Sequence, residues 1–222
     1  KVYADASAGG TDTASLIDAD GDETFVAKPT EATMTGAAYF LSAGHFDFVH
    51  GYAREGGEDT AWLYDSPGDD SFKGTPEYGK MTGDGFYNRA KLFEYTHAVA
   101  NAGGRDLARL YDSVGNDTFI ATPTYAKLFS DDFFLRAKQF EEVQGRGSGG
   151  EDLVQLRDSA GDDLLEADQN WVRLSNVEED FILHAIAFAQ VTAQSNSGDH
   201  DVATVAAAVD FLMLDGEWEE TQ

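Results

Sequence analysis

The sequence predicts an all-β protein: a parallel β-helix or β-solenoid built from about four repeats of some 47 residues. Three observations predict this fold class. The motif Gly-Gly-x-Asp recurs at nearly constant spacing, an alternating strand pattern follows each copy, and Gly, Asp and Asn residues supply turns between the short runs. The copies of the motif begin at Gly9, Gly56, Gly103 and Gly149.

The strand after each motif is the clearest element. In the second copy, Ala61, Leu63 and Asp65 alternate with larger outward residues, and this period of two is typical of a strand. A turn rich in Gly and acids follows, and then an apolar residue that we expect in the core. Because no Asn-Gly hairpin signal separates the runs, the pattern favours a chain that winds in one direction. The expected core residues are Phe25, Phe72, Phe119 and Leu165.

Two structural questions stay open at this stage. A repeat of this length fits either two turns of a β-helix or one turn with a long inserted loop. The segment 180–194 also has apolar residues at helical spacing, which keeps an α+β solenoid as the alternative.

Residues 1–195 are expected to form the solenoid, with repeats starting near residues 9, 56, 103 and 149. Residues 196–222 are expected to hold a degenerate fifth copy near Gly198, a cap that is a candidate for helical structure, and an acidic tail. Val2-x-Ala4-x-Ala6 matches Val49-x-Gly51-x-Ala53, so the chain begins inside a repeat. We therefore expect a piece of a longer array, in which flanking repeats are its first partners.

The charge and composition exclude several classes of protein. The formal net charge of −26 argues against nucleic acid as a partner, because neutralising phosphates requires clustered Lys and Arg. No apolar run is long enough to span a bilayer, so we expect no membrane insertion. The chain has no Cys, which rules out disulfides and thiolate metal sites.

The motifs Gly56-Gly57-x-Asp59 and Gly68-Asp69-Asp70 carry a family resemblance. They resemble the Asp/Gly-rich tandem repeats of large secreted or surface-attached bacterial proteins, and more distantly the hemolysin-type (RTX) calcium-binding repeats. That resemblance implies a secreted or cell-surface location and calcium binding. Individual ligands do not transfer, because the RTX motif is a nonapeptide, whereas this repeat is several times longer and lacks the third Gly.

Stacked repeats would place equivalent turn acids in files, with carboxylates on adjacent turns about 4.8 Å apart. Like charges at that spacing are destabilising, so amide hydrogen bonds, an intervening turn or a bound cation must offset them. Calcium fits, since it accepts several carboxylate oxygens in flexible geometry. Turn capping by the same side chains explains the pattern equally well. The candidate calcium ligands are Asp18, Asp22, Asp65, Asp69, Asp70, Asp112, Asp117, Asp158, Asp162 and Asp163.

Signals for catalysis are weak, and we expect no enzyme. No metalloprotease, serine-hydrolase or phosphate-binding motif occurs, and the five histidines are scattered. The outward side of the strand after each motif instead combines aromatic rings with Arg, which suits sugar rings and acidic glycans. The candidate glycan face consists of Trp62, Tyr64, Arg109, Tyr111 and Arg157.

The sequence therefore predicts a structural or adhesive repeat module of a large extracellular or cell-surface protein, with calcium as its candidate stabilising ion. Two alternatives remain. One is a carbohydrate-binding or polysaccharide-lyase-type β-helix that uses the candidate glycan face. The other is a self-assembling filament or surface-layer subunit, since exposed solenoid ends offer edge strands for pairing.

Overall fold

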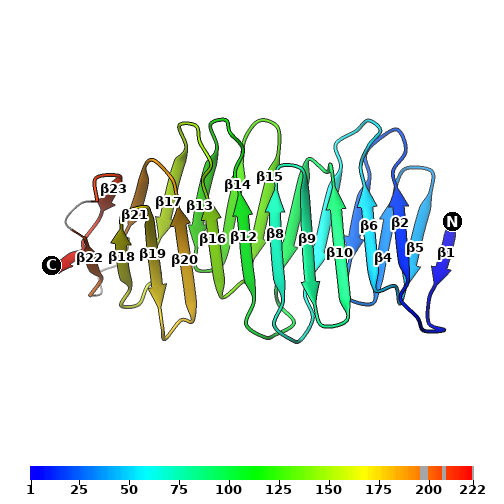
Figure 1. The fold of residues 1–222 in the computed structure, drawn as a ribbon, viewed down its shortest axis with the longest axis horizontal. Helices are drawn as coiled ribbons and strands as arrows, with labels where there is room; N and C mark the ends of the chain where they lie inside the picture. Colours follow the sequence, from blue (N-terminus) through cyan, green and yellow to red (C-terminus); the bar gives the residue numbers. More distant parts are fainter. Residues whose placement is uncertain (196–199, 207–208, 222) are drawn as a thin grey trace.

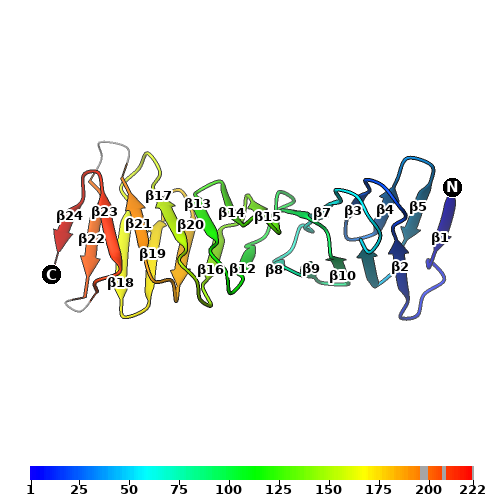
Figure 2. The ribbon, with the colours of Figure 1, turned by 90° about the horizontal axis from the view of Figure 1, so that it is seen from above.

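The computed structural model describes residues 1–195, 200–206 and 209–221, and every regular element in them is a β-strand. Two sheets of 12 strands each face one another and form an elongated, flattened solenoid with the termini at opposite ends (Figures 1 and 2). We call the sheet that contains β1 (Val2–Asp5) the first sheet and the one that contains β2 (Thr13–Ile17) the second. The predicted all-β solenoid is confirmed.

The helical alternative for the C-terminal part is wrong within the described residues. The segment 180–194 contains β20 (Phe181–Ile186) and β21 (Val191–Gln194) instead. Three short strands follow in place of a helical cap and extend both sheets by parallel pairing. They are β22 (Val202–Val205), β23 (Leu212–Asp215) and β24 (Glu219–Thr221). Gly198, near which the fifth copy was expected, lies outside the described residues.

Each repeat makes three half-turns of the solenoid. In the second repeat, β7 (Thr60–Tyr64) and β11 (Tyr95–Val99) lie in the first sheet and pair in parallel. Between them the chain forms an antiparallel three-stranded meander in the second sheet: β8 (Ser71–Thr75), β9 (Tyr78–Gly83) and β10 (Phe86–Lys91). The prediction of a chain that winds in one direction is therefore confirmed for the single strands. In each meander, the middle strand runs antiparallel to its two neighbours.

Because a repeat makes an odd number of half-turns, equivalent strands of successive repeats lie in opposite sheets. After β7 in the first sheet, β12 (Leu107–Tyr111) lies in the second and β17 (Leu153–Arg157) in the first again. Neither expected division of the repeat was right. The remaining strands are β3 (Thr24–Ala27), β4 (Glu31–Thr35), β5 (Phe40–Gly44), β6 (Phe48–Tyr52), β13 (Thr118–Thr122), β14 (Tyr125–Phe129), β15 (Phe134–Lys138), β16 (Glu142–Arg146), β18 (Leu164–Asp168) and β19 (Trp171–Asn176).

The inward residues of the two sheets form one continuous core along the solenoid. The predicted core residues Phe25, Phe72 and Phe119 have no exposed area. Phe25 packs on Phe93 with ring centroids 5.8 Å apart, and Phe119 packs on Phe188 at 5.9 Å. Such burial contributes about 2–3 kcal/mol for each large apolar side chain. The apolar positions of the repeat thus hold the two sheets together.

Candidate functional site

The acidic turns lie at the two long edges, where the chain crosses between the sheets (Figure 1). We call residues 18–23, 65–70, 112–117 and 158–163 the acid turns. The turn after β2 leads from the second sheet to the first, whereas the turn after β7 leads from the first to the second. Successive acid turns therefore alternate between the edges, and the single file expected for Asp18, Asp65, Asp112 and Asp158 is wrong.

Each of the first three acid turns stacks on the Gly-Gly-x-Asp segment of the next repeat, whereas the fourth contacts Asp201 through the Asp163 N–H. At the second acid turn, Asp65 Oδ2 accepts a hydrogen bond from the Ala102 N–H at 2.7 Å. Asp69 Oδ1 accepts one from the Arg105 N–H at 2.9 Å. In the reverse direction, the Asp70 N–H donates to Asp106 Oδ1 at 2.7 Å. The first and third acid turns repeat this scheme with residues 54–59 and 148–152.

The second Gly of the motif makes this stacking feasible. A Cβ atom on Gly57 would lie 2.0 Å from the carbonyl oxygen of Gly21 in the stacked acid turn, and Gly57 has φ +144°. The equivalent Gly104 and Gly150 meet Gly68 and Gly115 in the same way, at 2.2 and 1.9 Å. No side chain fits there, so the motif encodes a close backbone contact.

The stacking brings three carboxylates together at each contact: two come from the acid turn, and the third comes from the Gly-Gly-x-Asp motif or, at the fourth acid turn, from Asp201. We call each set an acidic triad. In three triads, one potential ligand atom from each residue lies within 4.8 Å of the other two. These triads are Asp18, Glu23 and Asp59; Asp112, Asp117 and Asp152; and Asp158, Asp163 and Asp201. The equivalent residues Asp65, Asp70 and Asp106 are buried and occupy the same turn positions, and we call them the second triad, although they do not meet the mutual distance of 4.8 Å.

Hydrogen bonds occupy only part of each triad. In the second triad, Ser66 donates its N–H and its hydroxyl to Asp70 Oδ2, at 2.7 and 2.8 Å. The other carboxylate oxygen, Asp70 Oδ1, receives no hydrogen bond. Among the described residues, every triad has at least one carboxylate oxygen that is buried and has no hydrogen-bond partner. All of these oxygens belong to residues that are at least nine-tenths buried. They are Asp18 Oδ1, Glu23 Oε2, Asp65 Oδ1, Asp70 Oδ1, Asp112 Oδ1, Asp117 Oδ1 and Asp163 Oδ1.

The protonation of the triads reflects this crowding. Burial, with the added repulsion of neighbouring carboxylates, raises the pKa of Asp59, Asp106 and Asp163 to about 6. Burial is also the main cause that raises the pKa values of Glu23, Asp70, Asp112 and Asp152. The folded protein therefore disfavours the charged form of these carboxyl groups relative to the unfolded chain.

The structure divides the predicted calcium ligands into two sets. Seven of them lie in triads: Asp18, Asp65, Asp70, Asp112, Asp117, Asp158 and Asp163. The other three, Asp22, Asp69 and Asp162, are exposed and accept backbone N–H groups of the stacked turn, so they cap turns. Five triad residues were not among the predicted ligands: Glu23, Asp59, Asp106, Asp152 and Asp201. The Asp of each Gly-Gly-x-Asp motif was the signal for most of them.

The candidate glycan face is divided between the two sides of the solenoid. Trp62, Tyr64 and Arg157 lie in the first sheet, whereas Arg109 and Tyr111 lie in the second. This separation follows from the odd number of half-turns per repeat. Trp62 instead packs against His97, with ring centroids 4.3 Å apart and planes tilted by 35°, and the Arg136 guanidinium lies over the Trp62 ring.

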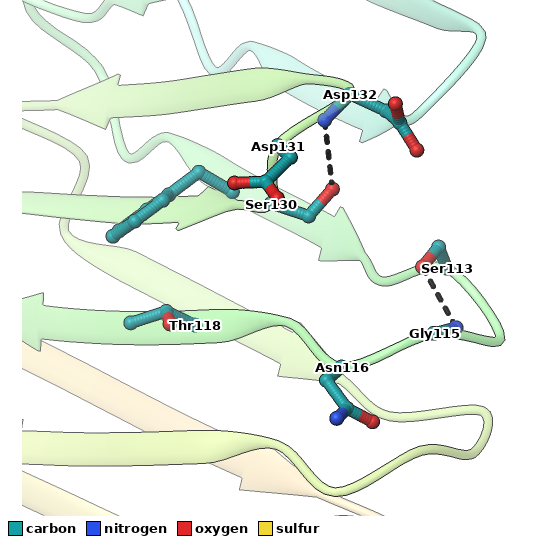
Figure 3. A pocket seen from close by; sticks show the side chains of 8 residues that line it. Ser113, Gly115, Asn116, Thr118, Ser130, Asp131 and Asp132 are labelled. Atoms are coloured by element: carbon teal, nitrogen blue, oxygen red, sulfur yellow. Dashed lines mark hydrogen bonds between the residues drawn. The ribbon is translucent and has the colours of Figure 1, made fainter.

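Figure 3 shows a hollow between the third acid turn and the hairpin turn after β14. Two of its serine side chains accept local hydrogen bonds. The Gly115 N–H donates to Ser113 Oγ at 2.9 Å, and the Asp132 N–H donates to Ser130 Oγ at 3.3 Å. These side chains stabilise the turns, and we assign no ligand to the hollow.

Comparisons with known proteins assign no family to this chain, since no protein-family model, curated protein or solved structure matches it. The described part of the chain contains no helix that is long and apolar enough to cross a membrane. Function is therefore inferred from the geometry of the edges and faces.

Proposed function

We propose that this chain is a structural repeat module of an extracellular or cell-surface protein, in which bound calcium joins successive repeats. The observation that carries the proposal is the set of buried carboxylate oxygens without hydrogen-bond partners in the acidic triads. An unpaired buried charge is strongly destabilising, so these oxygens require either protons or a cation.

The chemistry of the triads favours calcium among common cations. All the side-chain donors are carboxylate oxygens, which suit hard cations, and the Cys and His ligands preferred by zinc are absent from the triads. Three carboxylates on two separate turns form a flexible set that supplies several oxygens. Magnesium prefers a smaller and more regular octahedron, so we expect it to stabilise the fold less.

A cation in a triad would also have a clear mechanical effect. Each triad combines residues of one acid turn with an Asp some 35–43 positions further along the chain, so one ion would bridge consecutive repeats. In a solenoid, stability is close to a sum of repeat and nearest-neighbour terms. Bound calcium would strengthen the interface between neighbouring repeats. This suits a stiff spacer in surroundings where calcium is plentiful.

Thermal unfolding with and without calcium tests the proposal. We expect about 1 mM calcium to raise Tm well above its value in calcium-free buffer, and magnesium at the same concentration to raise it much less. A titration followed by calorimetry should show up to four calcium ions per chain, one for each triad. If calcium neither binds nor changes Tm, the proposal is wrong.

A further inference from the structure

The outer face of the second sheet carries a row of cations in an otherwise acidic protein. Lys73 on β8 lies directly opposite Lys80 on β9 and Arg109 on β12, and Lys80 lies opposite Arg89 on β10. We call these four residues the cation row. They are half-buried and stand on four adjacent strands, so at about 4.8 Å per strand the row runs roughly 14 Å along the long axis.

Among the described residues, the nearest acid on this face is Glu142 on the adjacent strand β16, which accepts a hydrogen bond from Gln144 and forms no ion pair with the row. The strands β6, β8, β9, β10 and β12 contain no Asp or Glu at all. No ion pair to any residue of the row occurs in the described part of the chain, although the full sequence has 41 acids for 15 Lys and Arg. Like charges in direct cross-strand register are destabilising. The fold therefore keeps an unfavourable arrangement that an external anion would relieve.

Tyrosines contact three of the four cations of the row. Lys73 Nζ lies 4.7 Å from the ring centroid of Tyr111, and Lys80 Nζ lies 5.5 Å from that of Tyr87. The Arg89 guanidinium donates a hydrogen bond to the Tyr52 hydroxyl at 3.1 Å. Cations thus cover a face of the Tyr87 and Tyr111 rings, which leaves the ring edges and the hydroxyl groups of these two tyrosines for a ligand. This disfavours base stacking and favours a partner that is rich in hydroxyls.

We propose that the cation row binds an extended anionic polysaccharide, with carboxylate or sulfate groups of successive sugars on Lys73, Lys80, Arg89 and Arg109. A flat sheet face, a straight row of charges and flanking phenols match a polymer that carries an anion at regular intervals. Only Arg109 and Tyr111 of the predicted glycan face belong to this surface. The proposal does not depend on calcium in the triads.

Binding to dextran sulfate, measured in calcium-containing buffer with uncharged dextran as comparison, tests the assignment. We expect binding to dextran sulfate that weakens with salt, and none to dextran. The double substitution Lys73→Gln/Lys80→Gln should weaken it about tenfold. The matched control Lys1→Gln/Lys28→Gln removes the same charge from residues outside the row and should bind as the unmodified chain does.

A charge reversal separates binding from folding. Lys80→Glu would place a carboxylate between Lys73 and Arg89, so it should raise Tm while it abolishes binding. Three results would overturn the proposal: no binding to dextran sulfate, equal binding of a single-stranded oligonucleotide of the same charge, or a salt-sensitive self-association that Lys80→Glu removes. The last would identify the acidic edge of a second copy as the true partner.

Discussion

At the scale of single residues, the two glycines of the motif have different roles. Gly57 lies against the carbonyl of Gly21 with a positive φ, whereas a Cβ on the adjacent Gly56 would meet nothing within 4 Å. We expect Gly57→Ala to lower the free energy of unfolding by about 2–4 kcal/mol, because both the backbone conformation and the contact oppose a methyl group.

Gly56→Ala is the matched control, and its expected change is below about 1 kcal/mol. Chemical denaturation of both variants measures the difference. Equal losses would show that the stacked turns separate easily, against the close contact described above.

The acidic triads make a prediction whose sign depends on calcium. Asp117→Asn keeps an oxygen that can accept the bonds from Ser113 but removes one negative charge beside Asp112 and Asp152. We expect a lower Tm than the unmodified chain in calcium, because a ligand is lost. In calcium-free buffer we expect an equal or higher Tm, because the carboxylates no longer repel one another.

Asp69→Asn removes one charge from an exposed turn-capping residue outside the triads. It should lower Tm only slightly and by the same amount in both buffers. If Asp117→Asn behaves in the same way, the triads do not bind calcium.

At the scale of the turns, the pH dependence of stability should have opposite signs in calcium-free and in calcium-containing buffer. Asp59, Asp106 and Asp163 have a folded pKa of about 6, above the usual value of 3.8. Between these values the folded protein binds more protons than the unfolded chain, so the stability from these groups is complete below pH 4 and is lost as pH rises to about 6. The exposed Asp5 has a pKa lowered to about 2, mainly by its hydrogen bonds to Ser7 and His45. The stability that Asp5 contributes is therefore lost only as the pH falls from about 4 to about 2.

Denaturation of the calcium-free protein should therefore show less stability at pH 7 than at pH 4.5. With calcium the order should reverse, since the metal binds the deprotonated form and releases protons. A calcium-free protein that gains stability as the pH rises through this range would contradict the assigned charges.

The strands and the core could be predicted from the sequence. Side chains that alternate between apolar and polar indicate a strand with one buried face, and apolar residues recur in each repeat at the positions of Leu63 and Phe72, which are buried. In the second repeat, the meander was missed because Asp84-Gly85, where Gly85 has φ +76°, is a hairpin signal that a search for Asn-Gly alone overlooks. The corresponding turns of the other repeats contain neither dipeptide, so their sequence carries no such signal. The triads were missed in part because a sequence period shows which residues are equivalent but not which turns touch. That depends on the number of half-turns per repeat.

At the scale of the whole molecule, most contacts in the described part of the chain run between neighbouring strands, although the ion pair of Arg105 with Asp180 reaches across β16. We therefore expect damage to stay local. In calcium, Asp117→Asn should speed hydrogen exchange in the strands next to the third triad, from β12 to β17, and leave β2 to β7 unchanged. Mass-resolved exchange of both proteins measures this. Uniform acceleration along the chain would show a single cooperative unit instead.

The three half-turns of each repeat have a consequence for any longer array of such units. Adding or deleting one copy would turn everything beyond it by about half a revolution, whereas changing the number by two would restore the original direction. The parity of the copy number, and not only the length, would then decide whether domains at the two ends of the array face the same side. A gain or loss of single copies would act as a two-position switch of orientation.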